Sequence, residues 1–336
     1  MKRHGALIIS LDFELNWGVH DSIPLEKYKE NLLGVREAIP EMLELFSRYD
    51  IHATWAIVGM LFFDDKKKLL ANFPDYLPSY QNENFSPYGK IESIGINENE
   101  DPFHYGLSLI KQIMNSPNQE IGTHTFSHYY CLEEGQTGHE FESDLTAACD
   151  VANAEGIHIK SIIFPRNQVN PAYLQICKEQ GIQCYRGTED SWVYQASRKN
   201  NEGYFKRAFR LLDCYINLFG HHTYPIGEVE TKQIVNLPSS RFLRPYQSKF
   251  NSIESLRLKR IKNSLTYAAK NNEVFHLWWH PHNFGKNLKE NIRFLREILD
   301  HVENLRSQYG FTSMTMEEAT KLALQWKKEK DSHAFL

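Results

Sequence analysis

The sequence lacks the features that mark membrane-spanning and disulfide-rich proteins. Its longest apolar run, around Ala56–Phe63, falls far short of the roughly 20 residues that a spanning helix needs. The apolar segment 6–11 is too short for the core of a secretory signal and Asp12 ends it, so we expect a cytoplasmic protein. The five cysteines form no CxxC pair. This predicts buried, reduced thiols, without a zinc ribbon or a disulfide framework.

The chain also has no marked excess of charge of either sign. Its 336 residues include 38 Lys and Arg against 42 Asp and Glu, which gives a formal net charge of −4. This balance argues against a broad surface for nucleic acid or anionic membrane, although it leaves room for a small basic pocket. With 41% hydrophobic and 24% charged residues, the composition is that of a globular protein. Histidine stands out, with 15 copies.

Short apolar strands alternate with helical segments along most of the chain. Apolar runs predict strands at 6–11, 53–58, 161–164, 182–185, 274–279 and 312–315. Helical periodicity predicts helices at 25–49, 140–153, 171–179, 253–270, 290–308 and 316–328. Strands that alternate with helices over this length predict an α/β fold with a parallel sheet, closed into a barrel.

Two long stretches interrupt this alternation. Residues 64–118 are rich in Asn, Pro, Tyr and charge, and residues 188–251 mix aromatic, basic and turn residues. Loops of this length are uncommon unless they serve a function. We therefore expect one domain over residues 1–330, with both stretches as insertions over the active-site face. The polar tail at 327–336 is expected to fray.

Polar clusters follow three of the apolar runs and one further short strand that begins at Glu120. Asp12 and Glu14 come directly after the first run, and His124 and His128 are four residues apart after the further strand. A histidine pair with a carboxylate makes three metal ligands and leaves a fourth position for water or substrate. Taken alone, Asp12 and Glu14 could equally well form an acidic turn. Two partly exposed histidines are an alternative, less favoured explanation of His124 and His128.

The other two clusters are Phe164–Gln168, which contains Arg166, and Trp278–His282, which contains two histidines. Taken alone, the first could be an ordinary surface turn with its arginine in water, and the second could be aromatic core followed by a proline-terminated loop. The carboxyl ends of parallel strands meet at one edge of the sheet, where α/β proteins place their active sites. The common placement of all four clusters therefore favours one shared site.

Together these residues resemble the polysaccharide deacetylase family, carbohydrate esterase family 4, with its nodulation-type deacetylase domain. The most specific element is His124–His128, which matches the H-S/T-x-x-H metal motif of the family in full. Weaker similarities lie at residues 7–14, 53–59, 164–168, 276–282 and 309–315. The resemblance implies a distorted (β/α) barrel, seven- or eight-stranded and TIM-like, and a hydrolase that acts on linear amide C–N bonds.

The family pattern assigns roles to individual positions. It implies a divalent metal held by Glu14, His124 and His128, first of all Zn²⁺, with Co²⁺, Ni²⁺ or Mn²⁺ as alternatives. Asp12 would be the catalytic base, His280 or His282 the general acid, and Arg166 and Asp190 would support them. Glu14 departs from the usual aspartate, and Pro165-Arg166 inverts the usual Arg-Pro order. Further contacts to the substrate are expected from Trp17, Asn167, Gln168, Trp192, Trp279 and His282.

The expected substrate is an N-acetylated saccharide, in the synthesis of a surface polysaccharide or lipopolysaccharide. Whether the sugar is linked to a nucleotide, a lipid or a polymer stays open, as does the oligomeric state. Two alternatives use the same fold. One is a metal-independent amidohydrolase that resembles allantoinases, and the other is a non-catalytic saccharide-binding relative. Neither nucleic acid nor a membrane span is expected.

Overall fold

A computed structural model describes residues 4–194 and 204–334 of the chain. Its centre is one sheet in which every pair of strands is parallel, in the order β6-β5-β4-β3-β2-β1-β8-β7, while β9 also pairs with β1. The strands are β1 (Ala6–Phe13), β2 (Ala53–Ile57), β3 (Gln119–Thr123), β4 (Ser161–Ile162), β5 (Cys184–Tyr185), β6 (Val235–Asn236), β7 (Arg241–Phe242), β8 (Val274–Trp279) and β9 (Thr312–Met314).

The segment that contains β6 and β7 closes the sheet into a barrel. On one side the Leu237 N–H donates to the carbonyl of Tyr185 in β5 at 2.9 Å. On the other side the Ser240 N–H donates to the His276 carbonyl of β8 at 2.8 Å. The two ends of the strand order are therefore joined through one short piece of chain. The predicted distorted (β/α) barrel is confirmed.

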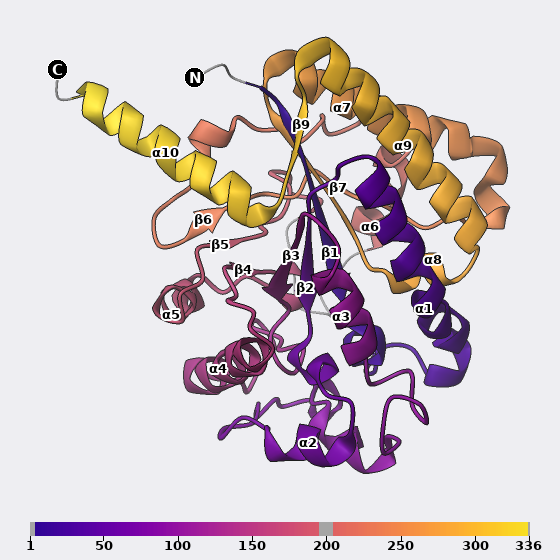
Figure 1. Cartoon of the computed structure of the whole chain (residues 1–336), viewed down its shortest axis with the longest axis vertical. Coiled ribbons are helices and arrows are strands. Elements are labelled where there is room, and N and C mark those ends of the chain that lie inside the picture. Colours follow the sequence, from indigo (N-terminus) through magenta and orange to yellow (C-terminus); the bar gives the residue numbers. More distant parts are fainter. Residues whose placement is uncertain (1–3, 195–203, 335–336) are drawn as a thin grey trace.

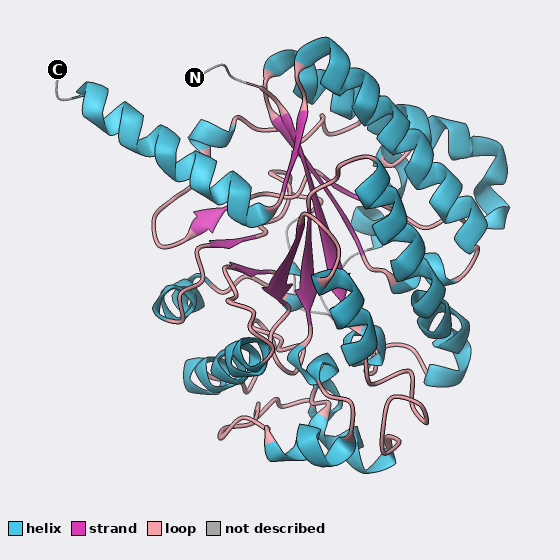
Figure 2. Ribbon diagram, in the orientation of Figure 1, coloured by secondary structure: helices cyan, strands magenta, loops and turns pink. Residues whose placement is uncertain are grey.

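Helices surround the strands, which gather at the centre of the molecule (Figure 2). They are α1 (Leu25–Arg48), α2 (Lys66–Ala71), α3 (Leu107–Met114), α4 (Gly138–Ala154), α5 (Leu174–Glu179), α6 (Tyr204–Asp213), α7 (Glu254–Asn271), α8 (His282–Gly285), α9 (Leu288–Tyr309) and α10 (Met316–Ala334). Figure 1 shows α2 and the chain around it beyond the carboxyl ends of β1, β2 and β3. The first insertion therefore lies at the end of the barrel where the polar clusters are found.

Local sequence signals explain where several helices begin and end. Thr137 and Glu140 form a reciprocal capping box at the start of α4, which satisfies backbone N–H groups that the helix leaves free. Gly310 ends α9 in the left-handed conformation, with φ of 68°, a conformation that glycine adopts without a steric cost. Helix α1 continues through Pro40, where the sequence predicts a break or a kink.

The core has two layers because side chains of β1 alternate between the two faces of the strand. Leu7, Ile9, Leu11 and Phe13 pack outward with the helices in the larger hydrophobic cluster. Ala6 and Ile8 belong to a smaller cluster, in which Met316 and two alanines of α10 close the amino-terminal end of the barrel. Further along β1, the inward-facing positions are polar.

Three features differ from or refine the expectations. Strands β6 and β7 lie within 188–251, so part of the expected second insertion belongs to the barrel itself; residues 195–203 lie outside the described part. Helix α10 continues to Ala334, so the expected frayed tail is helical as far as the structure describes it. The five cysteines are buried and form no disulfide, as predicted. Among the described residues, none of the helices combines the length and apolarity needed to cross a bilayer.

Candidate metal and catalytic site

Strand β1 delivers two carboxylates into the carboxyl-terminal mouth of the barrel. The alternation that turns Ile8 inward continues through Ser10 and Asp12, and Glu14 follows one residue beyond the end of the strand. Asp12 and Glu14 are both buried. The i and i+2 spacing recognised in the sequence therefore places two charged groups on the barrel side of β1.

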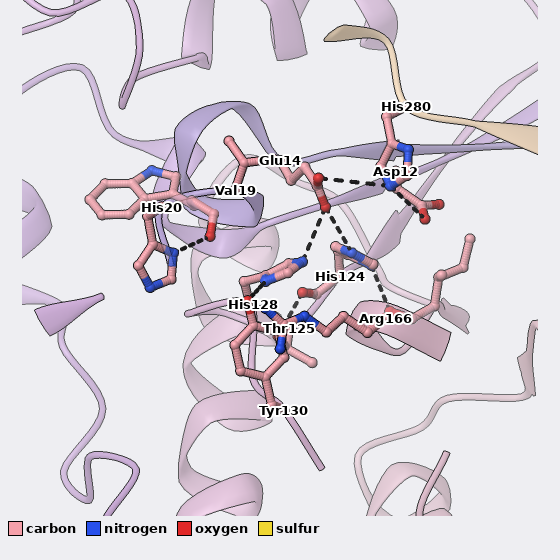
Figure 3. Close-up of polar contacts among 12 residues, drawn as sticks. Asp12, Glu14, Val19, His20, His124, Thr125, His128, Tyr130, Arg166 and His280 are labelled. Carbon is pink, nitrogen blue, oxygen red and sulfur yellow. Dashed lines mark hydrogen bonds and ion pairs between the residues drawn. The ribbon is translucent and has the colours of Figure 1, made fainter. Parts of the chain in front are cut away.

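Glu14, His124 and His128 come together as three potential metal ligands (Figure 3). Their ligand atoms all lie within 4.8 Å of one another, and all three residues are buried. One carboxylate oxygen of Glu14 lies 3.3 Å from Nε2 of His124 and 3.1 Å from Nε2 of His128. Imidazole nitrogens with a carboxylate oxygen are a common ligand set for zinc and similar cations.

The second nitrogen of each imidazole is held in a way that suits metal binding. Nδ1–H of His124 donates to the Ile163 carbonyl at 2.7 Å. Tyr130 donates its hydroxyl proton to Asp21, so the same hydroxyl oxygen accepts from Nδ1 of His128 at 3.2 Å. Both Nε2 atoms are therefore left with a lone pair directed at Glu14, as metal-ligating histidines require. Burial lowers the pKa of His128 to about 4, which keeps this ring neutral at pH 7.

Asp144 of α4 holds the loop that carries the two histidines. Its carboxylate accepts from the Phe126 N–H at 2.7 Å and the Ser127 N–H at 3.1 Å, and also from the Ser127 hydroxyl. The loop needs this support because Thr125 and His128 adopt positive φ angles, of 65° and 59°, which cost energy in residues other than glycine.

Gly18 makes room for the longer side chain of Glu14. A Cβ atom at Gly18 would lie 2.0 Å from Cδ of Glu14 and 2.2 Å from one of its carboxylate oxygens. A carboxylate cannot stay in place at such distances, so a larger residue at position 18 would displace it. Glu14, which stands in place of the usual aspartate, is thus accommodated by a glycine at position 18.

Arg186 pairs with Asp12 in the interior of the barrel. Its two terminal nitrogens lie 2.8 Å from the two carboxylate oxygens, and both residues are buried. Burial raises the pKa of Asp12, but the charge of Arg186 with further contributions from His124 and His280 outweighs it, and the pKa is lowered overall. The guanidinium also stacks on Trp278 at 4.0 Å and donates to the Asn167 amide oxygen at 2.9 Å. This bidentate geometry fixes the orientation of the carboxylate.

Two stacked histidines follow β8. Nε2 of His280 lies 3.8 Å from an oxygen of Asp12 and 3.8 Å from an oxygen of Glu14, so this ring faces both carboxylates. The ring of His282 stacks on it at 4.9 Å and lies 3.9 Å from Glu14. The His280 side chain is 24% exposed, whereas that of His282 is 4% exposed. His280 is therefore the more accessible of the two.

The structure does not place Arg166 beside Asp12, nor Asp190 beside Arg166 or His280, as their expected supporting roles would require. Arg166 adopts φ of 55°, which turns its side chain toward Asp21, and its guanidinium stacks on Tyr130 at 3.9 Å. The guanidinium beside Asp12 belongs instead to Arg186, which the sequence reading missed. Asp190 is exposed and makes no contact with Arg166 or His280 that the described residues show. A signal for Arg186 existed, since it directly follows the apolar strand β5.

The residues expected to contact the substrate fall into two groups. Trp17, Trp279 and Gln168 are buried and have structural partners. Trp17 donates to the His104 carbonyl, Trp279 stacks on Phe284, and Gln168 bridges Leu132 and Glu133. The remaining three are Asn167, which contacts Arg186, the exposed Trp192, and His282 beside Glu14.

The fold and the site together define a barrel protein in which three buried residues could hold a metal ion, beside a carboxylate and a histidine. Residues 31–185 match the family model for polysaccharide deacetylase. This match bears out the resemblance to the polysaccharide deacetylase family that the motifs predict. The matched segment contains His124 and His128, whereas Asp12, Glu14 and His280 lie outside it. No curated protein matches the chain by sequence.

Solved structures share the fold at low identity. A candidate polysaccharide deacetylase from Mycobacterium smegmatis superposes with a TM-score of 0.62 at 13% identity, covering 97% of this chain and 92% of the other. A second candidate deacetylase, from Pseudomonas aeruginosa PAO1, has a TM-score of 0.53 at 11% identity, with 94% and 89% covered. The allantoinase Puue has a TM-score of 0.52 at 12% identity, with 94% and 89% covered. At such identity the likeness establishes the fold.

Proposed function

We propose that the protein is a metal-dependent hydrolase that removes N-acetyl or similar acyl groups from an amino sugar. The substrate would be a saccharide or glycan precursor in the synthesis of a surface polysaccharide or lipopolysaccharide. The observation that carries the proposal is the convergence of a three-residue ligand set with a carboxylate and a histidine, Asp12 and His280, at the mouth of the barrel. The match of residues 31–185 to the polysaccharide deacetylase family model supports the reaction class.

Each group around this point has a distinct task in amide hydrolysis. A divalent cation, Zn²⁺ in the first place, would polarise the acetamide carbonyl and make the attacking water more acidic. Asp12, oriented by Arg186, would take a proton from that water as its oxygen bonds to the carbonyl carbon. His280 would donate a proton to the sugar nitrogen as the C–N bond breaks, which releases acetate and a free amine.

We assign the acid role to His280 because of its accessibility. Its ring is partly exposed and faces both Asp12 and Glu14, so it can meet the leaving nitrogen and then recover a proton from solvent. His282 is buried behind it and in contact with Tyr28. His282 would then act as a positioning residue that keeps the ring of His280 in its orientation.

Two substitutions test these roles separately. Asp12→Asn removes the base but none of the three ligands, so we expect acetate release to be abolished while the bound metal remains. His124→Ala removes a ligand, so both metal content and activity should be lost. Metal would be measured by elemental analysis and acetate by an enzyme-coupled assay on N-acetylated sugars. Near-normal turnover by Asp12→Asn would refute the assignment of the base.

A metal-independent amidohydrolase is the second candidate function. The observation that favours it is that the allantoinase Puue has the same fold. Complete removal of the metal distinguishes the two, because only the proposed deacetylase should then lose its activity. A cytoplasmic location stays a prediction, which cell fractionation would test.

A further inference from the structure

Helix α6 presents an apolar face to solvent. Phe205, Phe209 and Leu212 are spaced at i, i+4 and i+7, which places them on one side of the helix. These three residues are 80%, 39% and 49% exposed, respectively. The surface continues past the helix through Ile216, which is 57% exposed, and Leu218. Exposed apolar residues that cluster in this way mark a surface that contacts another molecule or a membrane.

Helix α6 also carries basic residues, outside its apolar face. Lys206, Arg207 and Arg210 lie on the same helix, and the Lys206 ammonium lies 5.9 Å from the ring of the exposed Trp192. The one acidic residue of α6 is Asp213, which is buried and pairs with Arg241 at 2.9 Å. Helix α6 therefore carries three basic residues against one acidic residue, although the whole chain has a formal net charge of −4.

A basic hollow adjoins the apolar face. It has a volume of about 580 Å³ and lies between residues 215–221 and α7, with Ile216 and Leu256 among its lining residues. Lys259 and Lys270 also line it, and both are exposed. Neither lysine forms an ion pair with any residue that the structure describes. The hollow thus combines an apolar edge with two ammonium groups, which suits the phosphate of a lipid headgroup.

We propose that α6, residues 214–218 and the outer side of α7 form a docking face for a membrane that contains anionic phospholipid. Amphipathic helices with basic borders bind at the membrane interface through apolar burial and attraction to anionic headgroups. The lysines of the hollow complement the phosphate groups of such lipids, which favours a membrane over a partner that would contact the apolar residues alone. This inference goes beyond the proposed reaction and would bring the enzyme to a lipid-linked saccharide.

Vesicle co-sedimentation of the full chain tests this proposal. Vesicles of phosphatidylcholine alone would be compared with vesicles that also contain phosphatidylglycerol. We expect strong binding only to the anionic vesicles, weakened by salt. Each basic residue near an anionic surface strengthens binding about fivefold, so Lys259→Glu/Lys270→Glu should weaken it by at least about 25-fold. Phe205→Ser/Leu212→Ser should also abolish sedimentation, since its two changes remove the apolar contact.

Matched controls keep the test specific. Ile96→Ser removes another exposed apolar residue, at 60% exposure, and Lys67→Glu/Lys289→Glu reverses the same number of charges elsewhere. Both controls should bind vesicles like the wild type, and all variants should release acetate from a soluble substrate at the wild-type rate. Equal binding to neutral vesicles, wild-type binding by either docking-face variant, or a dimer that Phe205→Ser/Leu212→Ser dissociates would overturn the proposal.

Discussion

Replacing Arg186 by Met separates the support of the catalytic base from metal binding. The guanidinium forms two 2.8 Å contacts with the buried Asp12 and none with the three proposed metal ligands. Breaking a buried ion pair on one side costs about 3–5 kcal/mol, because the remaining charge is left without a partner. Alternatively Asp12 takes up a proton, because burial then raises its pKa without opposition from the arginine. In either case the carboxylate is no longer an oriented base at pH 7.

We therefore expect Arg186→Met to lower kcat by about 10²–10⁴-fold, with metal affinity unchanged. Activity should partly recover at higher pH, where Asp12 ionises again, a change that a merely structural role would not produce. Arg186→Lys keeps the charge and should be less impaired, and adding Asp12→Asn to Arg186→Met should restore stability in urea. Arg257→Met removes another buried guanidinium, on α7, and should leave kcat unchanged. Wild-type kcat in a folded Arg186→Met protein would refute this reasoning.

The remaining predictions concern the ligand loop, Glu14 and stability. Gly18→Ala should weaken metal binding in calorimetry by about 10–100-fold, and Glu14→Asp in the same chain should restore part of it; unaffected binding by the single variant would count against the steric argument. Asp144→Asn leaves backbone N–H groups of the ligand loop short of acceptors, so it should cost about 1–3 kcal/mol in urea unfolding and reduce metal content. Burial, followed by the charge of Arg186, lowers the pKa of His276 to about 3. The unfolded chain binds a proton there below about pH 6.5 and the folded chain does not, so the urea midpoint should fall from pH 6.5 toward pH 4, less steeply in His276→Gln.

The sequence predicted the parts of this molecule that local signals specify. Strand β1 is a continuous apolar run that ends in two carboxylates, and it pairs in the middle of the sheet as such a run should. The spacing of His124 and His128 predicts a pair of metal ligands, and in the structure both lie beside Glu14. The carboxyl ends of parallel strands meet at one edge of the sheet. The proximity of these groups could therefore be predicted from the order of the strands, without knowing where each side chain points.

The features that the sequence did not predict depend on long-range contacts. Strands β6 and β7 are two residues each and surround Pro238, so they give no periodic signal, and pairing with β5 and β8 defines them. The choice between Arg166 and Arg186 as the partner of Asp12 depends on the backbone: Arg166 has a positive φ and turns away, whereas Arg186 directly follows a barrel strand. The position of Arg186 after an apolar strand is visible in the sequence, but the positive φ of Arg166, which decides between the two arginines, is not.

The most direct test of the central claim is acetate release from a panel of N-acetylated sugars by the protein before and after complete removal of its metal. The account predicts acetate and free amine in equal amounts, loss of both after chelation, and recovery when one equivalent of Zn²⁺ per chain is restored. Undiminished hydrolysis by the metal-free protein would contradict it, because Glu14, His124 and His128 would then be clustered for some purpose other than catalysis.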